Sequence, residues 1–416
     1  MKLLILTQYF PPEVGAPQNR LFELAVRLLK AGVEVTVLTA MPNYPKMEVY
    51  PEYRGKKFLH ENMEGISVYR SRIFVSKSKS ILNRLRNYFS FVISSALASR
   101  KIKGDFDFLL CESPPLFLGY SAMYIAKRKK AGLIFNVSDL WPESAEKLGV
   151  VTNKLLLKLA YNLEKKLYLR SVLVTGQTQG ICKDIGKRFL TVPTYWLPNG
   201  VDLGYYDPSK TKSTGWRSKL GFSPTDFVLM YAGIIGIAQG LEIILKAAQR
   251  FKTQPHVKFV LMGNGPEKEK LLQLKTELQL NNLFFLDAVS KKEMPGILKE
   301  VDVALVPLRK LELFLGAIPS KVFENLAMEV PVLLGVDGEA KDLFITKGKA
   351  GLFVEPENVE ALIAGIHTLE QDRALTKELG ENGRRFVMEN FNREQIASQF
   401  YTQLTKLLPV SKTVSK

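Results

Sequence analysis

The chain has 416 residues, of which 46% are hydrophobic and 24% charged, so it is long enough to bury two cores. It contains no low-complexity segment and no fixed-period repeat, which excludes fibrous, disordered and solenoid proteins. The formal net charge of +17 predicts an anionic partner, such as nucleic acid, an acidic membrane surface or a phosphorylated substrate.

The cysteines and the N-terminus indicate the compartment. Cys111 and Cys182 lie in apolar contexts without CxxC spacing, so we expect reduced thiols in a cytoplasmic protein. The first residues, MKLLILTQYF, are too few for a secretory signal and read as a buried strand. No stretch approaches the roughly 18 apolar residues of a spanning helix. We therefore expect a soluble protein or one bound peripherally to the inner face of the plasma membrane.

Short apolar strands alternate with amphipathic helices along both halves of the chain. In the first half the patterns predict strands at 3–10, 33–40, 105–115, 133–141 and 171–176, and helices at 19–32, 123–130 and 153–168. In the second half they predict strands at 227–233, 257–265, 282–287, 303–308 and 330–336, with helices between them. This alternation predicts parallel sheets covered on both faces.

A segment rich in turn-forming residues separates the two halves. We expect an N-terminal Rossmann-like domain at 1–197, a linker at 198–221 and a C-terminal Rossmann-like domain at 222–390. The last helix and tail, 391–416, are expected to pack back on the first domain. The predicted fold class is α/β, with two doubly wound Rossmann-like domains facing across a cleft that binds the ligand.

The stretch IPSKVFENLAMEVPVLLG carries the strongest candidate site. Pro319 and Ser320 suit the start of a helix, with Ser320 as its N-cap. The first turn and Lys321 would attract an anion, while Glu324 would accept hydrogen bonds from two ribose hydroxyls. The alternative is an ordinary capped helix with an exposed glutamate.

Three further segments follow strands in the same half. Gly233, Gly236 and Gln239 lie in YAGIIGIAQGLEII, whose glycines allow close approach of the backbone to a ligand. LMGNGPE contributes Gly263 and Asn264, and the loop at 287–290 contributes Val289, which could face a base. Each segment alone is also compatible with an ordinary strand-to-helix turn.

The order of these segments resembles the GT-B glycosyltransferases, in particular the retaining enzymes of family 4. LTQYFPPEVGAPQNR resembles their first loop, with Gly15 near the donor phosphates and the acceptor, and LPNGVD matches their linker at Asn199. MPNYP and DLWPES support a bacterial branch that transfers amino-deoxy sugars such as N-acetyl-fucosamine in O-antigen or capsule assembly. The resemblance implies a UDP-sugar donor bound by the C-terminal domain and a lipid-linked or polysaccharide acceptor bound by the N-terminal domain. It also implies retention of configuration and no metal or other cofactor.

The chain departs from the family at three places. Where the family commonly has a pair of glutamates, the first position is Gly316. A basic pair in the donor domain is replaced by Ile235 and Gln239, so Lys321 becomes the candidate cation for the leaving diphosphate.

Two carboxylates are candidates for the group that orients or deprotonates the acceptor. Many relatives have a histidine near DLWPES, and in this chain Asp139 occupies that neighbourhood. The role of acceptor base or orienting group therefore falls to Asp139, with Glu143 as second choice.

The sequence is also compatible with other functions and partners. Asp105 and Asp107 form a DxD pattern, a metal signature of a different glycosyltransferase fold. A UDP-sugar 2-epimerase with the same fold is the enzymatic alternative. Residues 81–103 predict either a core helix or an interfacial helix on anionic lipid. A nucleic-acid partner is disfavoured, because no recognised binding motif accompanies the basic residues.

Overall fold

The computed structural model describes residues 1–13, 15–44, 47–78, 80–149 and 151–408. Three of the sequence features fall partly outside these ranges: Val14 of the LTQYFPPEVGAPQNR stretch, Pro45 of the MPNYP motif, and residues 409–416 of the expected tail. The chain forms two compact units, one of Met1–Asn199 with the helix that starts at Arg393, and the other of Gly200–Asn392.

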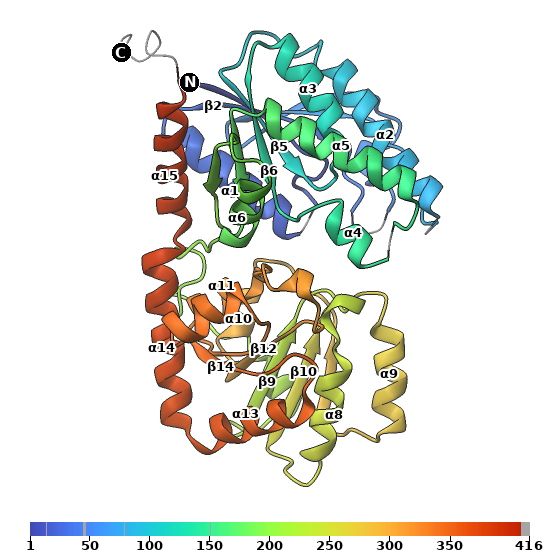
Figure 1. Cartoon of the computed structure of the whole chain (residues 1–416). Helices are drawn as coiled ribbons and strands as arrows, with labels where there is room; N and C mark the ends of the chain where they lie inside the picture. Colours follow the sequence, from blue (N-terminus) through green and yellow to red (C-terminus); the bar gives the residue numbers. More distant parts are fainter. Residues whose placement is uncertain (14, 45–46, 79, 150, 409–416) are drawn as a thin grey trace. The chain divides into compact units, whose positions relative to one another are not determined.

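The first unit contains an eight-stranded sheet (Figure 1). In spatial order its strands are β3 (Phe58–Met63), β4 (Ile66–Ser71), β2 (Glu34–Ala40), β1 (Lys2–Leu6), β5 (Phe108–Ser113), β6 (Gly132–Val137), β7 (Leu173–Gly176) and β8 (Thr194–Trp196). All neighbouring pairs are parallel except β3 and β4, which pair antiparallel with Phe58 opposite Ser71. The prediction of a parallel sheet therefore holds apart from this edge hairpin.

Helices cover both faces of this sheet because strand side chains alternate between them. Leu4 and Leu6 point into the core under α2 (Ile81–Ala98), α3 (Leu118–Arg128), α5 (Lys154–Arg170) and α6 (Gln179–Arg188). Leu3 and Ile5 point to the opposite face, under α1 (Ala16–Lys30) and α15 (Arg393–Lys406). The short helices α4 (Glu143–Lys147) and η1 (Pro51–Tyr53) lie in connections.

The second unit contains a six-stranded, fully parallel sheet. In spatial order its strands are β11 (Leu283–Leu286), β10 (Val257–Met262), β9 (Phe227–Ala232), β12 (Val303–Pro307), β13 (Val332–Gly335) and β14 (Gly351–Phe353). Its helical segments are α7 (Trp216–Lys219), η2 (Ile237–Gln239), α8 (Glu242–Arg250), α9 (Lys268–Glu277), α10 (Met294–Leu298), η3 (Glu312–Phe314), α11 (Lys321–Ala327), α12 (Glu339–Lys341), η4 (Asp342–Lys347), α13 (Val359–Gln371) and α14 (Arg373–Asn390). The fold class predicted from sequence, two doubly wound parallel-sheet domains, is confirmed.

Several element boundaries differ from those predicted. The strand expected at 3–10 ends at Leu6, and the Glu13 carboxylate accepts a hydrogen bond from the Phe10 N–H at 3.1 Å as the chain turns. The strand expected at 105–115 begins at Phe108. Ser113 ends that strand where the chain enters Pro114 and Pro115, which have no N–H to continue the ladder.

Two helical glycines provide a test of the packing. A Cβ on Gly380 of α14 would lie 2.1 Å from the backbone oxygen of Glu329, whereas a Cβ on Gly186 of α6 would meet nothing within 4 Å. Gly380→Ala should destabilise the fold by about 1–3 kcal/mol through overpacking, and Gly186→Ala should stabilise it by up to about 1 kcal/mol. Urea unfolding of both variants would measure this, and equal shifts of the same sign would contradict the packing described.

Candidate functional site

The glycine turns predicted to bind a ligand lie side by side in the second unit. Gly233 directly follows β9, and its N–H donates to the Met262 oxygen at 2.9 Å. The Ile235 N–H donates to the Asn264 oxygen at 3.0 Å, which joins the loop after β9 to the loop after β10. Carboxyl ends of adjacent parallel strands are where doubly wound sheets bind ligands, so this edge forms the floor of the candidate site.

The two loops approach so closely that only glycine fits. Gly263 has φ +143, and a Cβ there would lie 1.9 Å from the Gly233 oxygen. A Cβ on Gly265 would lie 2.2 Å from the Ile235 oxygen. These glycines are therefore required for the two loops to pack together, whether or not they also contact a ligand.

Lys321, at the start of α11, extends across this floor. Its ammonium lies 3.5 Å from the centroid of the Tyr231 ring, a cation–π contact with the second-last residue of β9. It also lies 2.7 Å from where a Cβ on Gly233 would be, so the glycine makes room for the cation. Tyr231, which sequence analysis missed, is held in turn by a 2.5 Å hydrogen bond from its hydroxyl to the Ile234 oxygen.

The surroundings of Lys321 weaken its proton affinity. Burial lowers the pKa of Lys321 to about 7, and the nearby Glu324 carboxylate acts in the opposite direction. Burial also raises the pKa of the Tyr231 hydroxyl, so that group stays neutral. A bound polyphosphate would therefore favour the protonated ammonium and be held by it.

The helix start differs from the prediction. Ser320 occupies the N-cap position but has helical backbone angles, φ −58 and ψ −28, and its side chain makes no capping hydrogen bond. The Val322 N–H already donates to the Pro319 oxygen at 3.1 Å, so the helical turn starts earlier and the capping role predicted for Ser320 is wrong. Because α11 has only 7 residues, its dipole is small, and the charge of Lys321 is the stronger attraction for an anion.

The loop after Gly236 lacks the basic pair common in family 4, and the structure places the basic residue Arg309 against it. Ile235 is fully buried, so a charged side chain does not fit there. The backbone N–H of Arg309 donates to the Ala238 backbone oxygen at 2.9 Å, and the Cγ of the Arg309 side chain packs on Gly240. Arg309, the second residue after β12, was not identified from sequence, because only the fold brings it to this loop.

The remaining second-unit residues lie at the same edge. Asn264 is exposed, and its side-chain oxygen accepts from Lys268, whose ammonium also pairs with Asp287 at 2.7 Å. Val289 is half-buried in the loop after β11. Gln239 folds its side chain back over Gly236.

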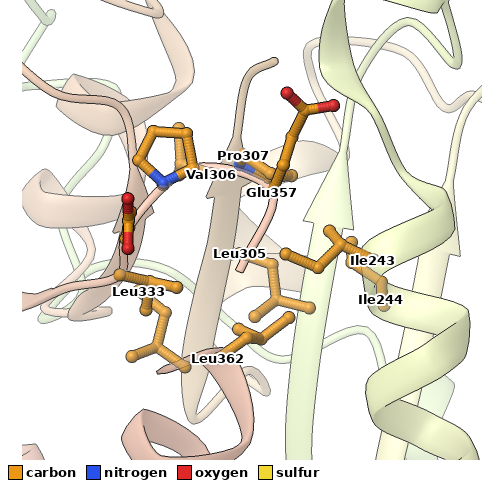
Figure 2. Close-up of a pocket in the computed structure, with 12 residues that line it drawn as sticks. Ile243, Ile244, Leu305, Val306, Pro307, Leu333, Glu357 and Leu362 are labelled. Atoms are coloured by element: carbon orange, nitrogen blue, oxygen red, sulfur yellow. The ribbon is translucent and has the colours of Figure 1, made fainter. Parts of the chain in front are cut away.

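Two cavities lie near these loops. Figure 2 shows the smaller, of about 20 Å³, which is lined mainly by Ile243, Leu305 and Leu362 and has room for about one water. A larger cavity, of about 610 Å³, lies at the carboxyl ends of β12, β13 and β14 and includes Arg309. Its other lining residues are Leu308, Lys310, Leu311, Glu312, Phe314, Leu315, Val336, Asp337, Phe353, Glu355 and Pro356.

Four of the predicted residues belong to the first unit. Asp139 follows β6 and accepts a hydrogen bond from the Ser144 hydroxyl at 2.8 Å. Although Asp139 retains an exposed surface, the protein around its carboxylate raises the pKa, and Glu143 adds to this effect. Glu143 itself pairs with Lys147 at 2.8 Å, which favours Asp139 over Glu143 as the base.

Gly15 and Asn199 have structural surroundings of their own. Gly15 is the residue before α1, with extended backbone at φ 176. Asn199 is buried, and its side-chain oxygen accepts a hydrogen bond from Arg393 at 3.2 Å. This contact ties the start of α15 to the segment that follows β8.

Both aspartates of the DxD pattern make contacts with other residues of the first unit. Asp107 accepts from the Lys2 N–H at 2.7 Å, and Asp105 pairs with Lys130 at 3.5 Å. Across the ranges that the structure describes, no three His, Cys, Asp or Glu side chains are grouped to hold a metal ion. In the same ranges, none of the helices combines the length and the apolar character needed to cross a bilayer.

Two parallel-sheet units, with a cationic site at the strand ends of the second, define the GT-B class of nucleotide-sugar transferases. Two family descriptions match the chain: Glycosyltransferase Family 4 over residues 18–205 and Glycosyl transferases group 1 over residues 212–386. The chain belongs to the group 1/family 4 glycosyltransferases, a retaining family that uses nucleotide-sugar donors and generally needs no metal.

Related proteins match this chain over nearly its full length. The chain is 26% identical to the putative colanic acid biosynthesis glycosyl transferase WcaI of Escherichia coli K12, covering 97% of this chain and 100% of that protein. It is 20% identical to the O-antigen chain mannosyltransferase C of E. coli, covering 98% of each. Anabaena Alr3699/HepE, solved with UDP and glucose, shares the fold at TM-score 0.73 and 18% identity, covering 98% of this chain and 100% of that one.

The Lys321 ammonium predicts a pH dependence of nucleotide binding. Above a pKa of about 7 the protonated fraction falls about tenfold per pH unit. UDP affinity should therefore fall steeply between pH 7 and 9, where the phosphates themselves stay fully ionised. Calorimetric titration at several pH values would measure the slope.

Lys321→Arg is the matched control, because arginine keeps its charge throughout this range. Its affinity curve should be nearly flat. A flat curve for the wild type, or the same slope in both proteins, would contradict the assigned role of Lys321.

Proposed function

We propose that this enzyme transfers an N-acetylated amino-deoxy hexose from a UDP-sugar to a lipid-linked or polysaccharide acceptor in bacterial surface polysaccharide assembly, with retention of configuration. The observation that carries the proposal is the Lys321 ammonium held between Tyr231 and Gly233, one helical turn from Glu324. Named relatives in colanic acid and O-antigen synthesis support the pathway. Because both halves match glycosyltransferases, the epimerase and nucleic-acid alternatives are set aside.

In the proposed reaction the diphosphate lies over Gly233 and Gly263, and Lys321 neutralises the charge that develops as it leaves. Glu324 binds the ribose hydroxyls. Arg309 adds a second cation in place of the family's basic pair. The acceptor hydroxyl attacks the anomeric carbon on the face that the diphosphate leaves, and its proton passes to the departing diphosphate as the bond between that carbon and the phosphate oxygen breaks. Asp139 orients the attacking hydroxyl.

The large cavity beside Arg309 is the proposed place of the donor sugar. Its walls include Leu311, Leu315 and the rings of Phe314 and Phe353, which suit the methyl groups of an N-acetylated deoxy sugar. Carboxylates such as Asp337 would accept hydrogen bonds from ring hydroxyls. Gly316, the residue after Leu315 of this wall, stands where the family commonly has a glutamate.

The acceptor is proposed to reach the enzyme at an anionic membrane surface, to which the first unit binds. Residues 65–104 contain no Asp or Glu, and α2 exposes Leu82, Ile93 and Leu97 to 58%, 60% and 53%. The same helix buries Phe91, so it is a core helix with an exposed apolar side. Exposed Arg84 and Arg86 share that helix, as an interfacial helix requires.

Transfer is tested with a panel of labelled UDP- and GDP-sugars and a bacterial total lipid extract as acceptor source. We expect label in the lipid fraction from one UDP-sugar, and the donor's anomeric configuration in the product by NMR. Asp139→Asn and Glu324→Gln should each lower the rate about 100-fold or more, since each removes a group assigned to bind or orient a reacting partner. An inverted anomer, or full activity in both variants, would contradict the mechanism.

Membrane binding is tested by flotation on vesicles with and without anionic lipid. Ile93→Glu should release the protein from anionic vesicles, because it places a carboxylate on the exposed side of α2. Met388→Glu, on an exposed residue of α14 in the second unit, is the matched control and should leave binding unchanged. Equal binding of all three proteins would rule out this surface.

A further inference from the structure

A buried polar network lies at the carboxyl edge of the first unit's sheet. Its centre is an ion pair between Arg20, in the second turn of α1, and Glu112, near the end of β5. The Arg20 Nη2 and Glu112 Oε1 atoms are 2.6 Å apart, and the two side chains are only 7% and 4% exposed. Arg20 also donates to the Ser138 hydroxyl at 3.1 Å.

The network extends across two more strands. Asn136 of β6 donates to the second oxygen of Glu112 at 2.5 Å, and the Thr175 hydroxyl of β7 donates to the Asn136 oxygen at 2.5 Å. The Ser138 hydroxyl also bonds to Glu112, and the Gln177 amide lies 2.6 Å from that hydroxyl. One helix and three strand ends are therefore locked together by charged and polar groups.

The network lies between two elements of the predicted site, the turn that carries Asp139 and the start of α1. Ser138 immediately precedes Asp139, whose carboxylate is itself held by Ser144 at 2.8 Å. At the other end, Arg20 lies five residues after Gly15, the predicted ligand-binding glycine before α1.

A buried ion pair is a poor source of stability, because removing two charges from water offsets most of their attraction. Apolar side chains would hold these elements together at least as well. What the charged and hydrogen-bonding groups add is direction, since each contact is satisfied at one geometry only.

We propose that Arg20, Glu112 and Ser138 are positioning residues for Asp139, which fix the turn after β6 relative to the start of α1. This inference rests on the proposed function, because it gives Asp139 the task of orienting the acceptor hydroxyl. A displacement of about 1 Å at such a group is enough to slow a reaction about 100-fold. The network controls the reaction step through Asp139 without touching the substrate.

The chain offers a matched control pair. Glu164 of α5 is 3% exposed and binds Arg188 of α6 at 2.8 Å, so it is also a buried carboxylate paired with arginine. Its partners lie on the helices that cover the sheet, away from the strand ends. Glu164→Gln therefore removes a comparable ion pair without acting on Asp139.

The experiment compares wild type, Ser138→Ala, Glu112→Gln, Glu164→Gln and Asp139→Asn in the lipid-transfer assay, with kcat, donor KM and the pH–rate profile. Ser138→Ala and Glu112→Gln should lower kcat about 10- to 100-fold and shift the pH–rate profile, with donor KM and UDP binding unchanged. Glu164→Gln should keep the wild-type kcat and profile. Ser138→Ala removes one hydroxyl and leaves both members of the Arg20–Glu112 ion pair in place, so it tests the inference even if Glu112→Gln fails to fold.

The outcomes separate this inference from the proposed function. If Asp139→Asn is inactive while Ser138→Ala and Glu112→Gln behave like Glu164→Gln, the network is structural and the inference is overturned. If the wild type transfers no sugar, or Asp139→Asn retains full activity, the proposed function or its assignment of Asp139 fails, and the positioning role fails with it.

Discussion

The contact between the Lys321 ammonium and the Tyr231 ring is the interaction on which the candidate donor site depends. It requires Gly233 to have no side chain, and the same Gly233 is also approached by Gly263, in the loop after β10. Burial of the ammonium is only partly offset by the Glu324 carboxylate, which is why the pKa of Lys321 falls to about 7. A bound diphosphate removes that penalty. The site therefore has an electrostatic reason to bind polyphosphate even though the family's basic pair is missing.

Local sequence patterns were sufficient to predict the alternation of strands and helices, because buried parallel strands read as short apolar runs. They also predicted that Gly233 and Gly263 follow strands. They did not reveal Tyr231 or Arg309 as site residues, since each acts only after folding brings it beside a distant loop. Ser320 was wrongly predicted to cap α11, because the backbone at Pro319 already turns into the helix. The antiparallel β3 was missed because an edge hairpin carries little apolar periodicity.

The two units contribute different chemistry to the proposed reaction. The second unit offers cations and close-packed backbone at its strand ends, as donor binding demands. The first unit offers a carboxylate, Asp139, and beneath it a hydrogen-bonded network of buried polar groups. Its outer helix α2 exposes leucine and isoleucine among arginines, an arrangement that matches a lipid-linked acceptor better than a nucleic acid. Under the proposed function, the same high positive charge would serve two anionic partners, a diphosphate and a membrane surface.

The central claim is that Lys321 and Glu324 form a nucleotide site, and thermal unfolding with UDP, GDP and ADP tests it most directly. A nucleotide at 100 times its dissociation constant should stabilise the wild type by about 2.7 kcal/mol. The account predicts stabilisation by UDP in preference to GDP and ADP, and its loss in Glu324→Ala. Equal stabilisation of the wild type and Glu324→Ala, or no response to any nucleotide, would contradict it.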